Sequence, residues 1–243
     1  MQLFACCAVS RLVLKDNTKL ERKTSGKVRR SLFLFMMTAE PFEAGFLHRP
    51  DHPSGHALVL THGASSNCNA PLLVAVAAEF AGAGFFVYRY DLPYRRKRPH
   101  GPPSPASAAA DRDGVREAAR IARSLASGKV IAGGHSYGGR QTTMAAAEDN
   151  QMADGLLLSS YPLHPPGRPE RLRTEHFSNL QTPALFFHGA KDAFGSEREM
   201  REALKQIPAP SDLVMVEGAG HDLGKVPARL APVIRERAGR FFF

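Results

Sequence analysis

The chain has 243 residues, of which 43% are hydrophobic and 23% are charged. This composition suits one globular core and excludes disorder as the main state. No stretch approaches the roughly 18 consecutive apolar residues that a membrane-spanning helix needs, so we expect no membrane span.

The basic residues outnumber the acidic ones, 32 against 23, an excess that can indicate nucleic-acid binding. Residues 1–36 hold eight of the basic residues and only two of the acidic ones, and the rest of the chain is nearly neutral. A basic tail on a nearly neutral domain is not a DNA-binding face. We therefore expect no nucleic-acid partner. We expect residues 1–40 to be a basic N-terminal extension, disordered or not translated, ahead of one domain over residues 41–243. The alternative is an arm that binds a membrane surface or a nucleic acid, since the apolar run Leu32–Met37 follows the basic run Lys27–Arg30.

The cysteines are Cys6, Cys7 and Cys68, and their spacing fits neither a disulfide framework nor a metal site. Such sparse use of cysteine suits a reducing compartment. The N-terminus also lacks the order of a secretory signal, in which positive charge precedes an apolar run. The expected location is the cytoplasm, and no metal is expected.

Short runs rich in Val, Leu, Ile and Phe alternate with longer Ala-rich segments. The runs predict buried strands over Ala57–Thr61, Phe85–Tyr90, Lys129–Ala132, Gly155–Ser159, Ala184–His188 and Leu213–Glu217. The longer segments predict helices over Pro71–Ala83, Ser107–Ala126, Tyr137–Asn150, Ser196–Gln206 and Val226–Ala238. This alternation predicts an α/β fold with a mostly parallel central sheet and helices on both faces. Phe42–His48 is an expected edge strand, and Pro93–Pro105 is an expected surface loop.

Polar, reactive residue types follow four of these predicted strands. In such sheets the chemistry lies at the carboxyl ends of the strands. The segment Gly134–Gly138 reads G-x-S-x-G between a predicted strand and a predicted helix. A serine on that sharp turn exposes its hydroxyl, so Ser136 is the expected nucleophile. A glycine-rich turn with a capping serine would explain the motif without chemistry, but the other strand ends favour the nucleophile.

A serine needs a base to take its proton and a third group to orient that base. In this fold the partners follow in the order Ser, acid, His, and Asp192 and His221 stand at the ends of later strands. Asp222 is an alternative acid, although its place next to His221 disfavours it. We expect the backbone N–H groups of Ala64 and Tyr137 to form an oxyanion hole.

Several further residues are expected to shape the pocket, namely His62, Gly63, Tyr94 and Tyr161. His62 would brace the loop after the first long strand. No G-x-G-x-x-G or Walker pattern follows an early strand, so no cofactor is expected.

Taken together, these motifs resemble the α/β-hydrolase superfamily over roughly residues 42–240. A closer likeness lies in Ser160–Gly167, Leu172–His176, Asp91–Tyr94 and Gly138–Arg140. These segments resemble a group of predicted hydrolases with bacterial dienelactone-hydrolase-like members. That group also includes animal testis-expressed hydrolase-like proteins and a regulatory subunit of the NSL histone-acetyltransferase complex. It often has Lys-Ser-Met where this chain has His135-Ser136-Tyr137. The resemblance implies the fold and leaves the substrate open.

Many such hydrolases insert a cap domain after the strand that follows the nucleophile's helix. Here the corresponding interval, Tyr161–Thr182, is too short for a domain. An open site without a cap disfavours substrates with long acyl chains. Basic residues of two loops are expected at the mouth and could steer an anionic substrate, namely Arg95, Arg96, Lys97, Arg98, Arg168, Arg171 and Arg173.

The sequence leaves two candidate functions. One is a serine hydrolase that cleaves a small soluble ester, thioester or amide through an acyl-enzyme. The alternative is a non-catalytic α/β-hydrolase-fold interaction module.

Overall fold

A computed structural model of the protein describes residues 10–12, 39–223 and 227–243. Most of the extension predicted over residues 1–40 therefore lies outside the described residues, and the division into extension and domain stays a prediction. Within the extension, strand β1 (Ser10–Leu12) is described, and it pairs in parallel with the last strand in chain order, at Val214–Val216. The sequence did not indicate this pairing.

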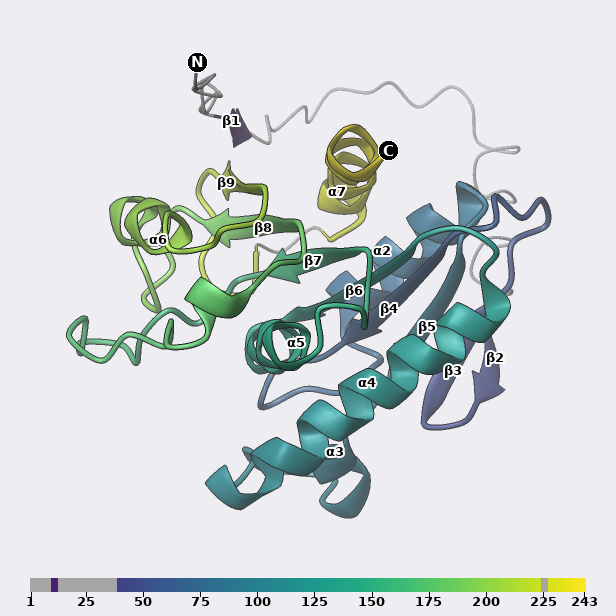
Figure 1. The fold of residues 1–243 in the computed structure, drawn as a ribbon, viewed down its shortest axis with the longest axis horizontal. Coiled ribbons are helices and arrows are strands. Elements are labelled where there is room, and N and C mark those ends of the chain that lie inside the picture. The colour runs from purple at the N-terminus through teal and green to yellow at the C-terminus, as the bar shows by residue number, and fades with distance from the viewer. Residues whose placement is uncertain (1–9, 13–38, 224–226) are drawn as a thin grey trace, which may run out of the picture.

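Among the described residues, the core of the fold is one sheet of nine strands in the order β1-β9-β8-β7-β6-β4-β5-β3-β2 (Figure 1). Its long strands are β4 (Ala57–Thr61), β5 (Phe86–Tyr90), β6 (Val130–His135), β7 (Gly155–Ser159), β8 (Ala184–Gly189) and β9 (Ser211–Val216), all mutually parallel. The chain leaves β4 toward β5 on one side and returns to β6 on the other. Such a switch point places a crevice at the carboxyl ends of the strands.

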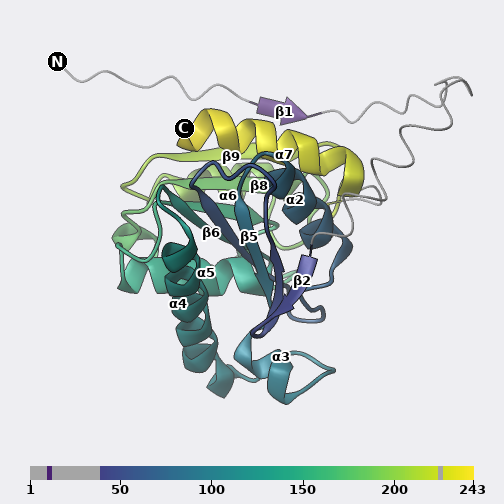
Figure 2. The same cartoon turned by 90° about the vertical axis from the view of Figure 1, so that its right-hand side faces the viewer.

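Helices cover both faces of the sheet, which confirms the predicted α/β architecture. Helices α4 (Ala108–Leu125), α5 (Tyr137–Glu148) and α6 (Glu197–Leu204) pack on one face. Helices α2 (Pro71–Gly82) and α7 (Pro227–Phe242) pack on the other (Figure 2). Alternate residues of each strand enter opposite cores; on β4, for example, Val59 faces α4 and Leu58 and Leu60 face α2. Because both faces are buried, the strands are nearly continuous apolar runs.

The predicted edge strand over Phe42–His48 is instead a hairpin of two short strands. Strand β2 (Ala39–Phe42) pairs antiparallel with β3 (Gly45–His48), which in turn pairs antiparallel with β5. Glu43 in the connecting turn has φ 45°, in the left-handed region where a chain can reverse tightly. Phe42 therefore ends one strand rather than beginning the next.

The Pro-rich segment over Pro93–Pro105 is not only a surface loop. It starts with a short helix, α3 (Pro93–Lys97), with Pro93 in the first turn, where a missing N–H costs nothing. Tyr94 and Arg95 on this helix are buried, which contradicts the expectation that the whole segment runs over the surface.

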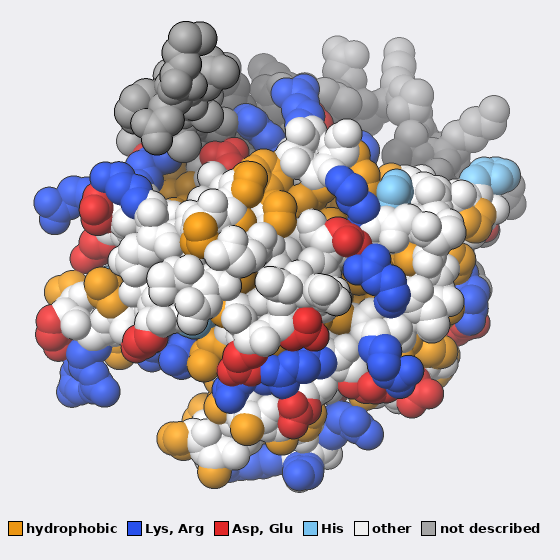
Figure 3. All heavy atoms as spheres, viewed as in Figure 1, with side chains coloured by type: hydrophobic (Ala, Val, Ile, Leu, Met, Phe, Trp, Pro, Cys, Tyr) orange, Lys and Arg blue, Asp and Glu red, His pale blue; other side chains and the backbone are white. Residues whose placement is uncertain are grey.

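Charges of both signs mix on the surface over α4 and α5 (Figure 3). Arg112 on α4 pairs with Glu148 on α5 at 2.9 Å, and Arg116 bonds the same carboxylate. Among the described helices, none combines the length and apolar character of a membrane span.

His48 at the end of β3 is a buried imidazole that faces a buried cation. Its Nε2 accepts a hydrogen bond of 2.9 Å from Nε of Arg89. Burial, followed by the positive charge of Arg89, lowers the pKa of His48 to about 4. The imidazole is therefore neutral in the folded protein near neutral pH.

This burial predicts a loss of stability in mild acid. Between pH 6.5 and 4 the unfolded chain protonates His48 and the folded protein does not, so the free energy of unfolding should fall as the pH falls through this window. The contribution of His48 to the slope of the unfolding free energy against pH approaches about 1.4 kcal/mol per pH unit. Urea unfolding at several pH values should show a shallower dependence in His48→Gln, which keeps an acceptor for Arg89. His100→Gln, at an exposed position, is the matched control and should keep the native slope; equal slopes in both variants would contradict the prediction.

Candidate active site

Ser136 occupies a sharp turn between β6 and α5. Its backbone has φ 52° and ψ −117°, an unfavourable conformation for a residue with a side chain. The turn holds because the Ser136 N–H donates to the Ser159 carbonyl at 2.9 Å. Neighbouring glycines permit close packing, since a Cβ on Gly138 would lie 2.5 Å from the His62 carbonyl oxygen.

The structure brings Ser136, His221 and Asp192 into one hydrogen-bonded chain, although they follow three different strands. His221 Nε2 lies 2.7 Å from Ser136 Oγ, and His221 Nδ1 lies 2.8 Å from Asp192 Oδ2. The second carboxylate oxygen, Oδ1, accepts the N–H of Phe194 at 2.9 Å. With Nδ1–H donated to the carboxylate, Nε2 of His221 is free to accept a proton from the serine hydroxyl.

Asp192 is an ionised carboxylate in a buried place. Its side chain is 0% exposed, and burial alone would raise its pKa. The hydrogen bonds from His221 and from the Phe194 N–H outweigh burial and hold the pKa of Asp192 below its ordinary value. A charged acceptor therefore faces His221 at neutral pH.

Three residues whose roles sequence reasoning missed hold the hydrogen-bonded side chains of the site in place. The Phe194 ring stacks on the His221 ring with centroids 4.2 Å apart. His135 Nε2 donates to the His221 carbonyl at 2.9 Å, and burial lowers the pKa of His135. His188 Nε2 donates to the Gly195 carbonyl at 2.7 Å, fixing the loop that carries Asp192. An aromatic or imidazole ring near a strand end has no distinctive spacing, so the sequence carried no signal for these roles.

The loop after β4 passes directly beside Ser136. A Cβ on Gly63 would lie 3.4 Å from Cβ of Ser136. His62 is completely buried; its Nδ1 donates to the Gly63 carbonyl at 2.9 Å, and its Nε2 accepts the Leu92 N–H at 3.2 Å. Burial lowers the pKa of His62, in keeping with this neutral tautomer. His62 thus braces the loop that carries Ala64.

The two tyrosines expected at the pocket have different positions. The Tyr94 hydroxyl lies 2.9 Å from the Ala64 carbonyl, and its ring packs edge-on against Tyr137 at 5.7 Å. Tyr137 is the first residue of α5, where a backbone N–H has no acceptor within its own helix. Tyr161, by contrast, lies in the core at 1% exposure and donates to the Arg173 carbonyl at 2.6 Å. It anchors the segment after β7.

Arg95 is not one of the free charges expected at the mouth. It is buried, and its guanidinium donates to backbone carbonyls, so these contacts rather than a substrate take up its N–H groups. Arg173 is half-buried and donates to the Pro162 carbonyl. The remaining five basic residues are exposed, namely Arg96, Lys97, Arg98, Arg168 and Arg171.

Only one short turn of 3-10 helix, Phe177–Asn179, interrupts the segment 161–182. No cap domain is inserted there, as the sequence predicted. Within the described ranges, no group of three or more His, Cys, Asp or Glu residues is arranged to hold a metal ion.

Comparison with known proteins identifies the family of the chain. The family model described as "Alpha/beta hydrolase domain" matches residues 54–229, which is well over half of the chain. The chain belongs to this alpha/beta hydrolase family. The match covers the loop after β4, the turn at Ser136 and both strand ends that carry Asp192 and His221.

Solved structures of other alpha/beta hydrolases share the fold. An alpha-beta serine hydrolase homologue from Coxiella burnetii has a TM-score of 0.64 at 16% identity, covering 82% of this chain and 95% of that one. A dienelactone hydrolase from Anabaena variabilis has a TM-score of 0.64 at 17% identity, covering 85% and 100%. A serine hydrolase described as lacking a lid, from Xanthomonas campestris, has a TM-score of 0.62 at 18% identity, covering 84% and 93%.

Proposed function

We propose that this alpha/beta hydrolase is a serine hydrolase that cleaves a small ester, thioester or amide through an acyl-enzyme. The observation that carries the proposal is the continuous hydrogen-bonded chain from Ser136 Oγ through His221 to the buried Asp192. A base within reach of the nucleophile, itself oriented by a third group, is the arrangement that activates a serine hydroxyl. Family membership supports a hydrolase in general.

In the proposed mechanism, Ser136 Oγ attacks the carbonyl carbon of the substrate while His221 Nε2 takes the hydroxyl proton. The negative charge that develops on the carbonyl oxygen is stabilised by the N–H groups of Ala64 and Tyr137. His221 then gives its proton to the leaving group as the bond to the acyl carbon breaks. Water, deprotonated by the same imidazole, releases the acid and restores Ser136. Asp192 keeps the imidazole in the required tautomer throughout.

The absence of a cap domain over residues 161–182 supports a small substrate. A long acyl chain needs an apolar cover, and the segment 166–172 consists of exposed residues. Acyl groups of a few carbons should therefore be favoured.

Labelling with a fluorophosphonate probe tests the proposal, followed by a panel of p-nitrophenyl esters from acetate to laurate. The expected result is one covalent label on Ser136 and turnover that falls as the acyl chain lengthens. A folded protein that takes no label and hydrolyses no ester would contradict the proposal and favour the interaction module.

A further inference from the structure

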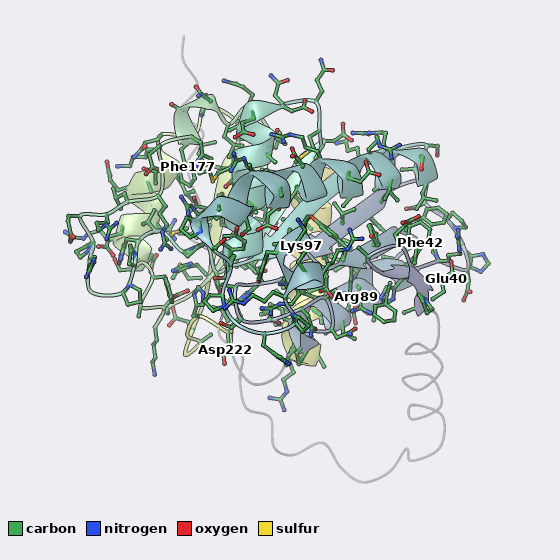
Figure 4. All side chains as sticks on the ribbon, turned by 90° about the horizontal axis from the view of Figure 1, so that it is seen from below. Glu40, Phe42, Arg89, Lys97, Phe177 and Asp222 are labelled. Carbon is green, nitrogen blue, oxygen red and sulfur yellow. The ribbon has the colours of Figure 1, made fainter. Side chains whose placement is uncertain are left out.

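Two buried arginines, one on β5 and one on α3, hold the loop between β4 and α2. Arg95 on α3 is 6% exposed. Its Nη2 donates to the Ala64 carbonyl at 2.9 Å and its Nε donates to the Ser66 carbonyl at 2.8 Å. Arg89 on β5 donates to the Cys68 carbonyl and to Asn69 Oδ1. Figure 4 labels Arg89 and Lys97, which mark the β5–α3 segment.

The planar guanidinium group of Arg95 donates to several neutral oxygens at once. Its remaining acceptors are the carbonyls of Arg98 and Gly101 and the Tyr94 hydroxyl, so every hydrogen bond it forms with the described chain goes to a neutral oxygen. Burying a cation without a carboxylate is costly unless each donor is satisfied. A planar fork of five N–H donors can satisfy several carbonyls at once, which an ammonium group cannot do in the same way.

Hydrogen bonds on both sides of Ala64 fix the direction of its N–H. Because the peptide unit is planar, the Ala64 N–H points opposite to the Gly63 carbonyl. That carbonyl accepts from His62 Nδ1 and from the Ser66 N–H at 3.1 Å. The next carbonyl, that of Ala64, accepts from Arg95 and from the Tyr94 hydroxyl. Both peptide planes that flank Ala64 are therefore fixed.

Asp111 on α4 connects this loop with the start of α5. Its carboxylate is completely buried; Oδ1 accepts the Tyr94 N–H at 2.9 Å and Oδ2 accepts the Tyr137 hydroxyl at 2.8 Å. One framework thus contacts the two residues, Ala64 and Tyr137, whose N–H groups form the oxyanion hole of the proposed function.

We propose that Arg95 and Asp111 are positioning residues that set the oxyanion hole by fixing Ala64 and Tyr137. The inference rests on the proposed function, and it assigns to a buried arginine a role that its sequence neighbours Arg96, Lys97 and Arg98 do not share. Oxyanion donors accelerate acyl transfer only when they are aimed before the charge develops, so loosening the framework should slow the chemical step more than it weakens substrate binding.

Arg95→Met tests the proposal, with Arg96→Met at the neighbouring exposed position as the matched control. With a neutral ester, kcat should fall roughly 100-fold in Arg95→Met while KM stays near the native value. Arg95→Lys should recover part of the loss. Amide hydrogen exchange over residues 63–69 should be faster in Arg95→Met than in Arg96→Met, and Asp111→Asn should also lower kcat.

Native kcat and native exchange in Arg95→Met would overturn the proposal. If Arg95→Met does not fold, Arg95→Lys decides, because its ammonium group cannot satisfy the same carbonyls as the guanidinium fork; native kcat and native exchange over residues 63–69 in Arg95→Lys would overturn the proposal as well. Failure of the proposed function has a different signature. In that case the native protein shows neither labelling nor turnover, and the exchange of residues 63–69 alone supports or overturns the fixing of the loop.

Discussion

Ser136→Ala should abolish fluorophosphonate labelling and lower kcat for esters by roughly a million-fold, the loss typical of removing a serine nucleophile. The residual rate would come from binding and from the oxyanion donors. The fold should persist, because the backbone bond from the Ser136 N–H to Ser159 does not involve the side chain. Labelling followed by mass spectrometry, single-turnover kinetics and thermal unfolding would measure the three effects.

The chain offers a matched control one strand away. Ser160 follows β7, has φ 51° and is completely buried, so it shares the residue type, the backbone strain and the edge of the sheet with Ser136. Its Oγ has no hydrogen-bond partner in the described chain. Ser160→Ala should therefore keep labelling and turnover, whereas a Ser136→Ala protein that still takes the label would exclude Ser136 as the nucleophile.

Asp192→Asn should lower kcat about 10⁴-fold, as expected when the acid of such a chain becomes an amide. The amide NH₂ can donate to His221 Nδ1, which favours the tautomer with the proton on Nε2. That proton then points toward Ser136 Oγ, and the imidazole can no longer take the hydroxyl proton. Steady-state kinetics at neutral pH would measure the loss.

Asp222→Asn is the control for this change, because Asp222 follows His221 directly in the sequence; Figure 4 labels Asp222. We expect a much smaller effect on kcat. If the two effects were reversed, Asp222 would be the acid and the hydrogen bond from His221 to Asp192 would have another role.

The strands were predictable where both of their faces are buried. The bounds of β4 and β7 agree with prediction, since continuous apolar runs mark a strand covered on both sides. Strand β6 extends to His135, beyond the predicted end at Ala132. Gly133 and Gly134 suggest a turn, yet they lie in the strand, where a Cβ on Gly133 would be 2.3 Å from the Leu157 carbonyl oxygen.

The candidate site was predictable to the extent that residues at strand ends must meet at one edge of a parallel sheet. This rule, together with the G-x-S-x-G motif and the chain order Ser, acid, His, predicted Ser136, Asp192 and His221 as neighbours. The supporting contacts were not predictable in the same way. Arg95 lies in a run of basic residues that reads as solvated charge, and only the helical turn begun by Pro93 directs its side chain inward. Phe194 stacks on His221 through a loop whose path has no sequence signature.

Strand β1 has a consequence for how copies of the protein meet. It pairs with Val214–Val216, so it covers the main-chain groups of β9 at that border of the sheet. Those groups would otherwise be open to any extended chain, and exposed borders of this kind are where sheets of separate molecules join. Deletion of β1 would free such a surface without touching Ser136 or His221. Self-association could then increase while the chemistry stays intact.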